Sequence, residues 1–251
     1  MRHDRATIVY ADDRLLVVNK PPGVSLSTRK SEPRKAVDRL LACMEAADLS
    51  MNGINPGELL LVHRLDVGTS GLLMLARDQD THRLLSRELS ERRIEKVYLA
   101  LVWGHPRPRA GRYDWPLAPD RRDRRRMKVD PAGSPAATRY RTLADARHVS
   151  LVELRPETGR THQLRVHLAH AGHWIVGDDL YGGPRHRAVS ERKLRLILNP
   201  SHLLLHAWQL SLPELQGLCS RRFEAPLPRE FSAALEGLGI SPGMLEHSRV
   251  W

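Results

Sequence analysis

Residues 59–77, LLLVHRLDVGTSGLLMLAR, contain two apolar runs separated by a short polar segment of glycine, threonine and serine. Runs of this length, bounded by turn-forming residues, predict two β-strands, LLLVHRL and GLLMLAR, joined through DVGTS. Asp66 is then at the end of a strand, where the chain enters a turn. If VHRLD is extended, Arg64 and Asp66 share one side and could both face a cleft. Such an aspartate is in most proteins only a turn former, so a catalytic interpretation needs support from elsewhere.

Outward from this segment the chain contains many short strands and few helices. Strands are expected at residues 7–10, 15–19, 94–104, 136–143, 149–156, 202–212 and 219–226, and helices at 36–49, 80–93, 158–172 and after Pro228. A threonine is expected to cap the helix that ends at Gly172. The absence of a regular βαβ rhythm predicts an α+β fold with a largely antiparallel sheet. Residues 105–136, rich in Pro, Gly and Arg, predict a basic loop or irregular hairpin.

Length and charge indicate a globular protein that attracts polyanions. A chain of 251 residues, 41% of them hydrophobic, can bury a substantial core as one large domain or two intimate lobes. Lys and Arg number 40 against 29 Asp and Glu, which gives a formal net charge of +11. Nucleic acid is therefore the leading class of partner, and a basic surface without a partner is the alternative.

Several other classes of protein are disfavoured by the sequence. Cys43 and Cys219 are far apart and form no disulfide framework, which indicates a reducing compartment and hence the cytoplasm. No apolar run is long enough for a signal peptide or a membrane span. His167, His170 and His173 recur every third residue, but they lack the HExxH arrangement and a cysteine partner, so no metal site is expected.

Two segments near residue 170 bear on anion binding. Arg160 and Arg165 lie close to a predicted helix start, where guanidinium and backbone N–H groups suit phosphate or carboxylate, although such residues are more often surface ion-pair partners. The segment 172–179, GHWIVGDD, has the glycine spacing of a phosphate-binding loop but Asp178 where lysine belongs. No nucleotide cofactor is expected. With only 5% aromatic residues and no cluster of them, a module that binds single strands mainly by base stacking is also disfavoured.

Five segments resemble, in order, the successive signatures of the RluA-type RNA pseudouridine synthase family. They are VVNKPPGV (17–24), HRLDVGTSGLLMLARD (63–78), KVYLALVWG (96–104), TGRTHQLRVHLAHAGHWIVGDDLYG (158–182) and LLLHAWQL (203–210), and they span roughly residues 6–227. The resemblance implies an α+β catalytic fold whose mainly antiparallel central sheet is divided between two subdomains that flank an active-site cleft. It implies a single catalytic domain over residues 1–251 without an appended RNA-binding domain. It also implies isomerisation of uridine to pseudouridine in structured RNA without a cofactor.

The resemblance assigns roles to individual residues. Asp66 is at the position of the family's catalytic aspartate, Tyr98 at that of the active-site tyrosine, and Arg165 at that of an arginine expected to pair with the aspartate. Arg64 corresponds to the residue that enters the RNA stack beside the flipped base. The sequence departs from the family at Trp174, where relatives commonly have proline, and in SLSTRKSEPRK (25–35).

The chemistry implied by the family explains why one carboxylate would suffice. Isomerisation breaks a C–N bond, turns the uracil and forms a C–C bond to the same sugar. An ionised aspartate could act as a nucleophile toward sugar or base, or could deprotonate the sugar, and the sequence leaves these routes open. Flipping the uridine out of its stack costs a few kcal/mol, which RNA contacts can offset. The candidate RNA contacts are Arg64, Lys20, Lys96, Arg160, His162, Arg124, Arg125, Arg126, Lys128 and the basic residues of 28–35.

The expected substrates are hairpins of large-subunit ribosomal RNA, of transfer RNA, or of both, and the expected state is a cytoplasmic monomer. Two alternatives belong to other functional classes. One is a catalytically idle RNA-binding or ribosome-assembly factor on the same fold, which would be free to lack Asp66, Tyr98 and Arg165. The other is a metal-dependent hydrolase built on the histidines, which would be sensitive to chelators.

Overall fold

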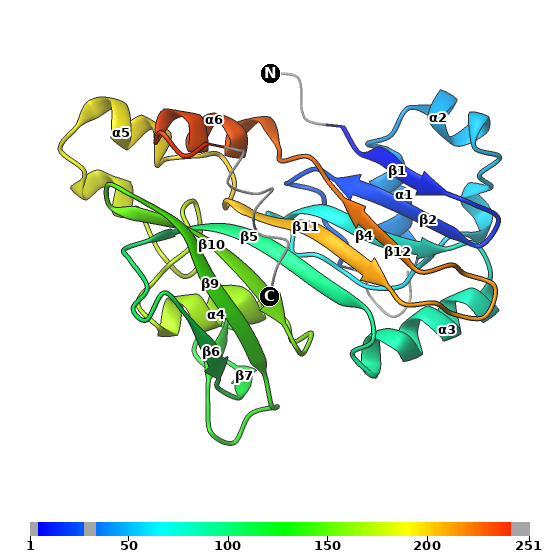
Figure 1. Ribbon diagram of the computed structural model, residues 1–251, viewed down its shortest axis with the longest axis horizontal. Coiled ribbons are helices and arrows are strands. Elements are labelled where there is room, and N and C mark those ends of the chain that lie inside the picture. The colour runs from blue at the N-terminus through cyan, green and yellow to red at the C-terminus, as the bar shows by residue number, and fades with distance from the viewer. Residues whose placement is uncertain (1–4, 28–33, 242–251) are drawn as a thin grey trace. The chain divides into compact units, whose positions relative to one another are not determined.

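The computed structural model describes residues 5–27 and 34–241, and these residues form strands and helices in two compact units (Figure 1). The first unit comprises Met1–Lys96 and Ala207–Pro228, and the second comprises Val97–His206 and Arg229–Trp251. The chain passes from one unit to the other three times. Two of the boundaries fall within strands, between Lys96 and Val97 and between His206 and Ala207, and the third falls between Pro228 and Arg229.

The first unit is built on short strands in the order β1-β2-β4-β11, with β3 paired to β4 and β12 paired to β11. Its elements are β1 (Thr7–Ala11), β2 (Leu15–Lys20), α1 (Lys35–Leu41), α2 (Ala46–Met51), the 3-10 helix η1 (Pro56–Glu58), β3 (Leu60–Leu61), β4 (Ser70–Ala76), α3 (Gln79–Ser90), β11 (Leu205–Leu212) and β12 (Arg221–Glu224). The pairs β1–β2, β2–β4, β3–β4 and β11–β12 are all antiparallel.

The core of the first unit is formed by apolar residues of β2, β4, α3, β11 and β12 and of the segments that adjoin them. Every residue of β4 is buried, and β2 is buried except at Asn19. The core cluster contains Leu15, Val17, Leu72, Met74, Leu85, Ile94, Leu210, Leu212, Leu218, Phe223 and Ala225. Burial of such leucine and phenylalanine side chains contributes roughly 1.5–3 kcal/mol each. The antiparallel pairing of β4 with β2 fixes the place at which β4 begins, directly after the segment that carries Asp66.

Gly71, near the start of β4, is required by a close backbone approach. Its φ is +108°, a conformation that L side chains rarely adopt. A Cβ at this position would lie 2.3 Å from the carbonyl oxygen of Ala207. Only glycine therefore fits between β4 and β11 at this point.

The helix predicted at residues 36–49 is interrupted, and α1 and α2 form instead. The carbonyl oxygen of Cys43 accepts the N–H of Ala6 at 3.0 Å, so it is bonded outside the helix. Glu45 is extended, with φ −80° and ψ 133°. The first helix therefore ends at Leu41, before the end of the helix that the i, i+3, i+4 apolar pattern predicts. The chain then turns before α2 begins.

The second unit contains strands in the order β5-β10-β9-β6 and a separate two-stranded sheet, β7-β8. Its elements are β5 (Glu95–Trp103), β6 (Ala110–Asp114), β7 (Leu117–Pro119), β8 (Met127–Val129), β9 (Ala137–Ala146), β10 (Val149–Pro156), α4 (Gln163–His170), the 3-10 helix η2 (Arg185–Ala188), α5 (Arg192–Ile197) and α6 (Arg229–Gly237). The pairs β5–β10, β10–β9, β9–β6 and β7–β8 are antiparallel.

These pairings confirm the predicted α+β fold with a largely antiparallel sheet. The irregular basic hairpin expected within residues 105–136 is also found, as β7 and β8 with their connecting loop. No helix in the described residues is long and apolar enough to cross a membrane. Of the basic segment 28–35, one of the expected RNA contacts, residues 28–33 lie outside the described residues.

Candidate active site

The turn at Asp66 is formed because the preceding strand stops early. The strand predicted over residues 59–65 ends at Leu61, so VHRLD is not a continuous strand. After it, the imidazole Nε2 of His63 accepts the backbone N–H of Met74 at 3.2 Å. Burial, aided by the nearby Lys96 charge, lowers the pKa of His63 to about 3, so its ring is neutral and can accept this bond. Asp66 itself enters a turn, as predicted, and its carbonyl accepts the N–H of Thr69 at 3.1 Å.

The backbone beside Asp66 is held by the KPPG turn that follows β2. The carbonyl oxygen of Val67 accepts the N–H of Gly23 at 2.7 Å and the Lys20 ammonium at 3.3 Å. The ammonium also donates to the carbonyls of Pro21, at 2.8 Å, and Val24, at 3.2 Å. Two segments more than 40 residues apart in sequence are thus joined around one buried cation.

Lys20 cannot be a surface contact for RNA in this structure. Its side chain is fully buried, and its ammonium donates to three backbone carbonyls. Burial lowers the pKa of Lys20 to about 7, and the negative charge of Asp66 opposes that shift. We therefore assign Lys20 to the Asp66 turn and omit it from the proposed RNA contacts. Asp66 itself is partly exposed, and Arg64, two residues before it, is exposed.

Tyr98 is on β5, and its position follows the predicted strand alternation. Its Cα partner across the antiparallel pair is Leu154 of β10, and Tyr98 is 8% exposed. Lys96, on the same face of the strand by alternation, is partly buried, and burial lowers its pKa. The backbone of Tyr98 is therefore fixed by the sheet of the second unit.

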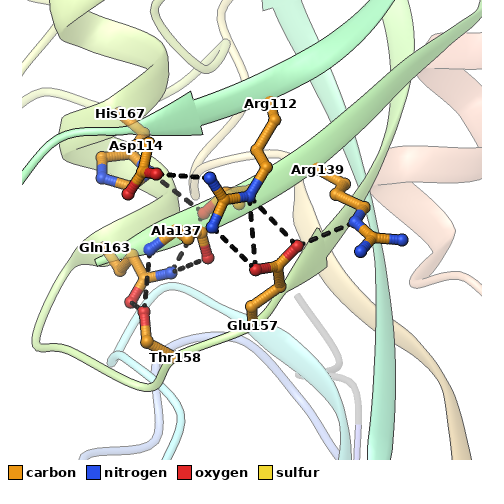
Figure 2. A network of polar contacts seen from close by, with 9 residues as sticks. Arg112, Asp114, Ala137, Arg139, Glu157, Thr158, Gln163 and His167 are labelled. Atoms are coloured by element: carbon orange, nitrogen blue, oxygen red, sulfur yellow. Dashed lines mark hydrogen bonds and ion pairs between the residues drawn. The ribbon is translucent and has the colours of Figure 1, made fainter. Parts of the chain in front are cut away.

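The loop before α4 is held by Gln163 and not by the predicted threonine cap. The Gln163 side chain accepts from Thr158 Oγ1 at 2.6 Å and donates to the carbonyl of Ala137 at 2.9 Å (Figure 2). It also accepts from the backbone N–H of Arg160 at 3.0 Å. The helix cap is His162, with a left-handed φ of 55° and no capping side-chain bond. One amide thus ties the loop to β9.

Arg165 projects from the first turn of α4 and forms a buried ion pair. Its Nε and Nη2 atoms donate to Oδ2 and Oδ1 of Asp178 at 2.7 and 2.8 Å. The two side chains are 9% and 1% exposed. Oδ1 of Asp178 also accepts the N–H groups of Leu180, at 3.1 Å, and Tyr181, at 3.2 Å. The bidentate geometry fixes the plane of the guanidinium.

Asp178 and Tyr181 are residues whose contribution the sequence did not reveal. In the sequence, Asp178 is only an argument against a phosphate-binding loop. The DDLYG segment belongs to a family signature, but no role is assigned to its residues. The spacing of 13 residues between Arg165 and Asp178 carries no helical or strand periodicity that would signal a pair. The tyrosine contacts both Arg165 and the basic hairpin, as described below.

The basic residues of the β7–β8 loop divide into paired and unpaired groups. Arg125 bonds Asp123, with Nη2 to Oδ2 at 2.8 Å, and Lys128 bonds Asp130 at 2.9 Å. The guanidinium of Arg126 lies over the Tyr181 ring. Within this loop, all of which the structure describes, the exposed side chains of Arg121, Arg122 and Arg124 form no hydrogen bond or ion pair, although the charge of Arg121 helps to lower the pKa of Asp130.

The candidate site residues are distributed over both units. The first unit holds Arg64 and Asp66, whereas the second holds Tyr98 and Arg165 together with Arg160 and His162. Arg160 is exposed, and its Nε donates to the carbonyl of Pro135 at 3.1 Å. The expected pair between Asp66 and Arg165 joins different units and stays a prediction.

The histidines of α4 have structural partners. His167 is fully buried, with Nδ1 3.0 Å from Thr138 Oγ1 and Nε2 3.0 Å from the Trp115 carbonyl. Burial lowers its pKa, so the neutral ring is favoured. Within residues 5–27 and 34–241, no three His, Cys, Asp or Glu side chains gather in a group that could hold a metal ion.

Comparison with known proteins places these features in a family. The model of the RNA pseudouridylate synthase family matches residues 14–170. The dual-specificity RNA pseudouridine synthase RluA of Escherichia coli (strain K12) is 38% identical over 223 residues, which cover 87% of this chain and 92% of that protein. An uncharacterized RNA pseudouridine synthase of Chloroflexus aurantiacus is 43% identical over 222 residues, 88% of this chain but only 65% of that relative.

Solved structures give the same result. The structure titled human RNA pseudouridylate synthase domain containing 4 is similar with a TM-score of 0.67 at 28% identity, and 92% of each chain is covered. The corresponding human domain containing 1 gives a TM-score of 0.62 at 27% identity and covers 95% of this chain and 96% of that one. The similarity extends over nearly the whole chain and is not confined to one motif.

Proposed function

Because this chain belongs to the RNA pseudouridylate synthase family and is an isomerase that acts on RNA, we propose that Asp66 is the carboxylate that converts specific uridines to pseudouridine. The observation that carries the proposal is the setting of Asp66. It lies in a turn next to Val67, whose carbonyl is held by both Gly23 and Lys20. The backbone is thus fixed, while the partly exposed carboxylate can reach a substrate.

The reaction needs an ionised carboxylate at its first step. The C–N bond between uracil N1 and ribose breaks, the base turns, a bond forms from C5 to the same sugar carbon, the C5 proton leaves to solvent, and N1 takes up a proton. Atoms balance without consumption of water. Asp66 could start the reaction as a nucleophile toward the sugar or the base, or by removing a sugar proton. Each route fails if the carboxylate is replaced by an amide.

In this proposal Tyr98 and Arg165 complete the site. The Tyr98 ring offers a flat surface for the extruded uracil, and its hydroxyl can take part in proton transfer. Arg165 keeps the role that the family resemblance gives it, that of the positively charged partner of the catalytic aspartate. Support for a fixed orientation of Arg165 comes from its two bonds to Asp178.

RNA binding is proposed to involve the exposed cations and base flipping. Arg64 is exposed and two residues from Asp66, which suits a side chain that enters the stack beside the flipped uridine. Phosphates would be contacted by Arg160 and by the unpaired arginines of the β7–β8 loop, Arg121, Arg122 and Arg124. Four other candidates from the sequence, Lys96, His162, Arg125 and Lys128, are assigned lesser parts, because Lys96 is partly buried and the rest have partners within the chain. Arg126, whose guanidinium lies over the Tyr181 ring at the end of the basic loop, stays among the proposed RNA contacts.

We propose hairpins of large-subunit ribosomal RNA, of transfer RNA, or of both as substrates. The names of similar proteins support this range. One is called a dual-specificity RNA pseudouridine synthase, and a Haemophilus influenzae protein, 35% identical over 96% of this chain and 72% of its own length, is called ribosomal large subunit pseudouridine synthase D.

The test is release of tritium from C5-labelled uridine in unmodified transfer RNA and ribosomal RNA. Wild-type protein should release tritium, whereas Asp66→Asn should release none and still bind the RNA in a filter assay. Release by Asp66→Asn would refute the catalytic role of the aspartate. Binding without release by the wild type on both RNAs would favour an idle RNA-binding factor, and chelator-sensitive formation of free uracil would favour a hydrolase.

A further inference from the structure

Tyr181 lies where the turn after α4 meets the basic hairpin. The turn begins at Asp178, and Tyr181 donates its backbone N–H to the Asp178 carboxylate at 3.2 Å. Its partly buried side chain packs, as do those of Met127 and Val129, against a small buried apolar cluster of Leu117, Ala136 and Val166. The cluster and the side chains packed on it include residues of both hairpin strands and of α4, so Tyr181 contacts both elements.

The hydroxyl of Tyr181 bonds to two segments that are distant in sequence. Its oxygen accepts the backbone N–H of Met127, the first residue of β8, at 2.8 Å. The Nδ1 atom of His162, the left-handed cap residue directly before α4, is 2.9 Å away. If the hydroxyl proton is donated to Nδ1, both bonds are made with one hydroxyl. The phenol therefore joins the end of the basic loop to the start of the helix that carries Arg165.

The ring of Tyr181 contacts two guanidinium groups. The Cζ atom of Arg165 is 5.0 Å from the ring centroid, and the Cζ atom of Arg126 is 5.1 Å from it. Both distances are within the range of a cation–π contact. The Arg165 guanidinium, already bonded to Asp178 along one edge, is thereby confined also by the aromatic ring. Arg126, which belongs to the basic loop, shares that ring.

We propose that Tyr181 is a positioning residue whose ring couples RNA contact at the β7–β8 hairpin to the orientation of the Arg165 guanidinium. The inference rests on the proposed function and adds to it a link between binding and chemistry. If bound RNA moves the Arg126 guanidinium away from the Tyr181 ring or closer to it, the surroundings of the Arg165 guanidinium change. The coupling requires an aromatic ring at residue 181 and a cation at residue 126.

A merely structural role for Tyr181 predicts different behaviour. In that case its replacement lowers stability or the fraction of folded enzyme, but Arg126 and Arg165 act independently. Tyr10 provides a matched control in the other unit: its hydroxyl donates to Asp12 at 2.7 Å, and the Arg221 Cζ atom is 4.4 Å from its ring centroid. Tyr10→Leu therefore removes the same kinds of contact at a place remote in sequence from the hairpin.

The experiment measures single-turnover tritium release at saturating enzyme, with the dissociation constant of the RNA measured separately. Tyr181→Leu should lower the rate by at least about 10-fold, as expected for loss of a partly desolvated cation–π contact, with little change in RNA affinity. Tyr181→Phe, which keeps the ring, should retain most of the rate, and Tyr10→Leu should match the wild type. Arg126→Ala should slow the wild type but have no further effect in the Tyr181→Leu background.

A second readout does not depend on activity. The Nε–H resonance of Arg165, assigned with Arg165→Lys, should shift on Arg126→Ala when Tyr181 is present and stay unchanged when it is leucine. An unchanged rate in Tyr181→Leu, an equal loss in Tyr181→Phe, or additive effects of the two substitutions would overturn the coupling. If the wild type releases no tritium, the proposed function fails, and the resonance still decides whether the ring couples the two arginines.

Discussion

Arg165 and Asp178 form a bidentate ion pair in the interior of the second unit, with donor to acceptor distances of 2.7 and 2.8 Å. The carboxylate also accepts two backbone N–H groups of the turn that follows it. Four bonds thus converge on one side chain, and the backbone of the turn holds the Oδ1 atom that also accepts from Arg165. This relationship gives a direct prediction for stability.

Asp178→Ala should strongly destabilise the protein, because it leaves a buried guanidinium without its partner. Breaking a buried pair in this way costs about 3–5 kcal/mol in the free energy of unfolding. Asp178→Asn, which keeps the shape and can accept one bond, should lose less stability but still reduce tritium release. Asp123→Ala, which removes the partly exposed partner of the exposed Arg125, is the control and should unfold almost as the wild type does. Urea unfolding checks all three, and an Asp178→Ala variant as stable as the control would contradict the prediction.

The β7–β8 loop should bind RNA through its unpaired arginines. Replacing Arg121, Arg122 and Arg124 together by glutamine should weaken RNA binding and reduce the slope of log affinity against log salt by about 2 to 3, since each phosphate contact contributes about 0.7–0.9. Filter binding at several salt concentrations measures both.

A control with the same change of charge separates local contacts from the overall field. Arg187, Arg192 and Lys193 are exposed residues around η2 and α5, and their joint replacement by glutamine also removes three positive charges. This variant should keep a salt slope close to that of the wild type. Equal losses in both triple variants would assign the effect to net charge and refute a specific role of the loop.

Lys20 should make the stability of the protein depend on pH above neutrality. Its pKa is about 7 in the folded protein and 10.5 in the unfolded chain, so between these values the unfolded state binds more protons. The free energy of unfolding therefore gains a contribution that rises with pH from about 7 to about 10.5, by at most about 1.4 kcal/mol per pH unit. Below pH 7 Lys20 is protonated in both states, and the full cost of burying the ammonium lowers the free energy of unfolding.

The contribution can be isolated by substitution. Lys20→Met lacks the titrating group, and the difference in unfolding free energy between wild type and variant should change with pH across this window. Lys193→Met, at an exposed position, should run parallel to the wild type. Parallel curves for Lys20→Met as well would show that Lys20 keeps an ordinary pKa in the folded state.

The parts of the fold that follow from local sequence were predictable. The apolar runs of β2, β4 and β10 form strands close to the expected residues, and α3 and α6 begin near the expected positions. In each case burial and periodicity agree over a whole element. The turn at Asp66 was predictable for the same reason, because it separates two such runs.

Other parts depend on contacts between distant residues. The imidazole of His63 replaces a backbone carbonyl as partner of Met74, and this ends β3 earlier than the apolar pattern suggests. The burial of Lys20 depends on the carbonyl of Val67, which belongs to another segment. The partner of Arg165 is likewise decided by the turn that brings Asp178 against α4. None of these three contacts can be predicted from local sequence pattern.

Gly71 has a consequence for mutational tolerance. It is five residues from Asp66 in a segment that reads as catalytic, yet the reason for glycine here is the carbonyl oxygen of Ala207, 2.3 Å from where a Cβ would be. In a library of all substitutions, position 71 should be as intolerant as an active-site residue. The activity of its variants, however, would be lost because less folded protein accumulates, and not because the chemical step is impaired. Intolerance near a reactive group is therefore not by itself a sign of catalysis.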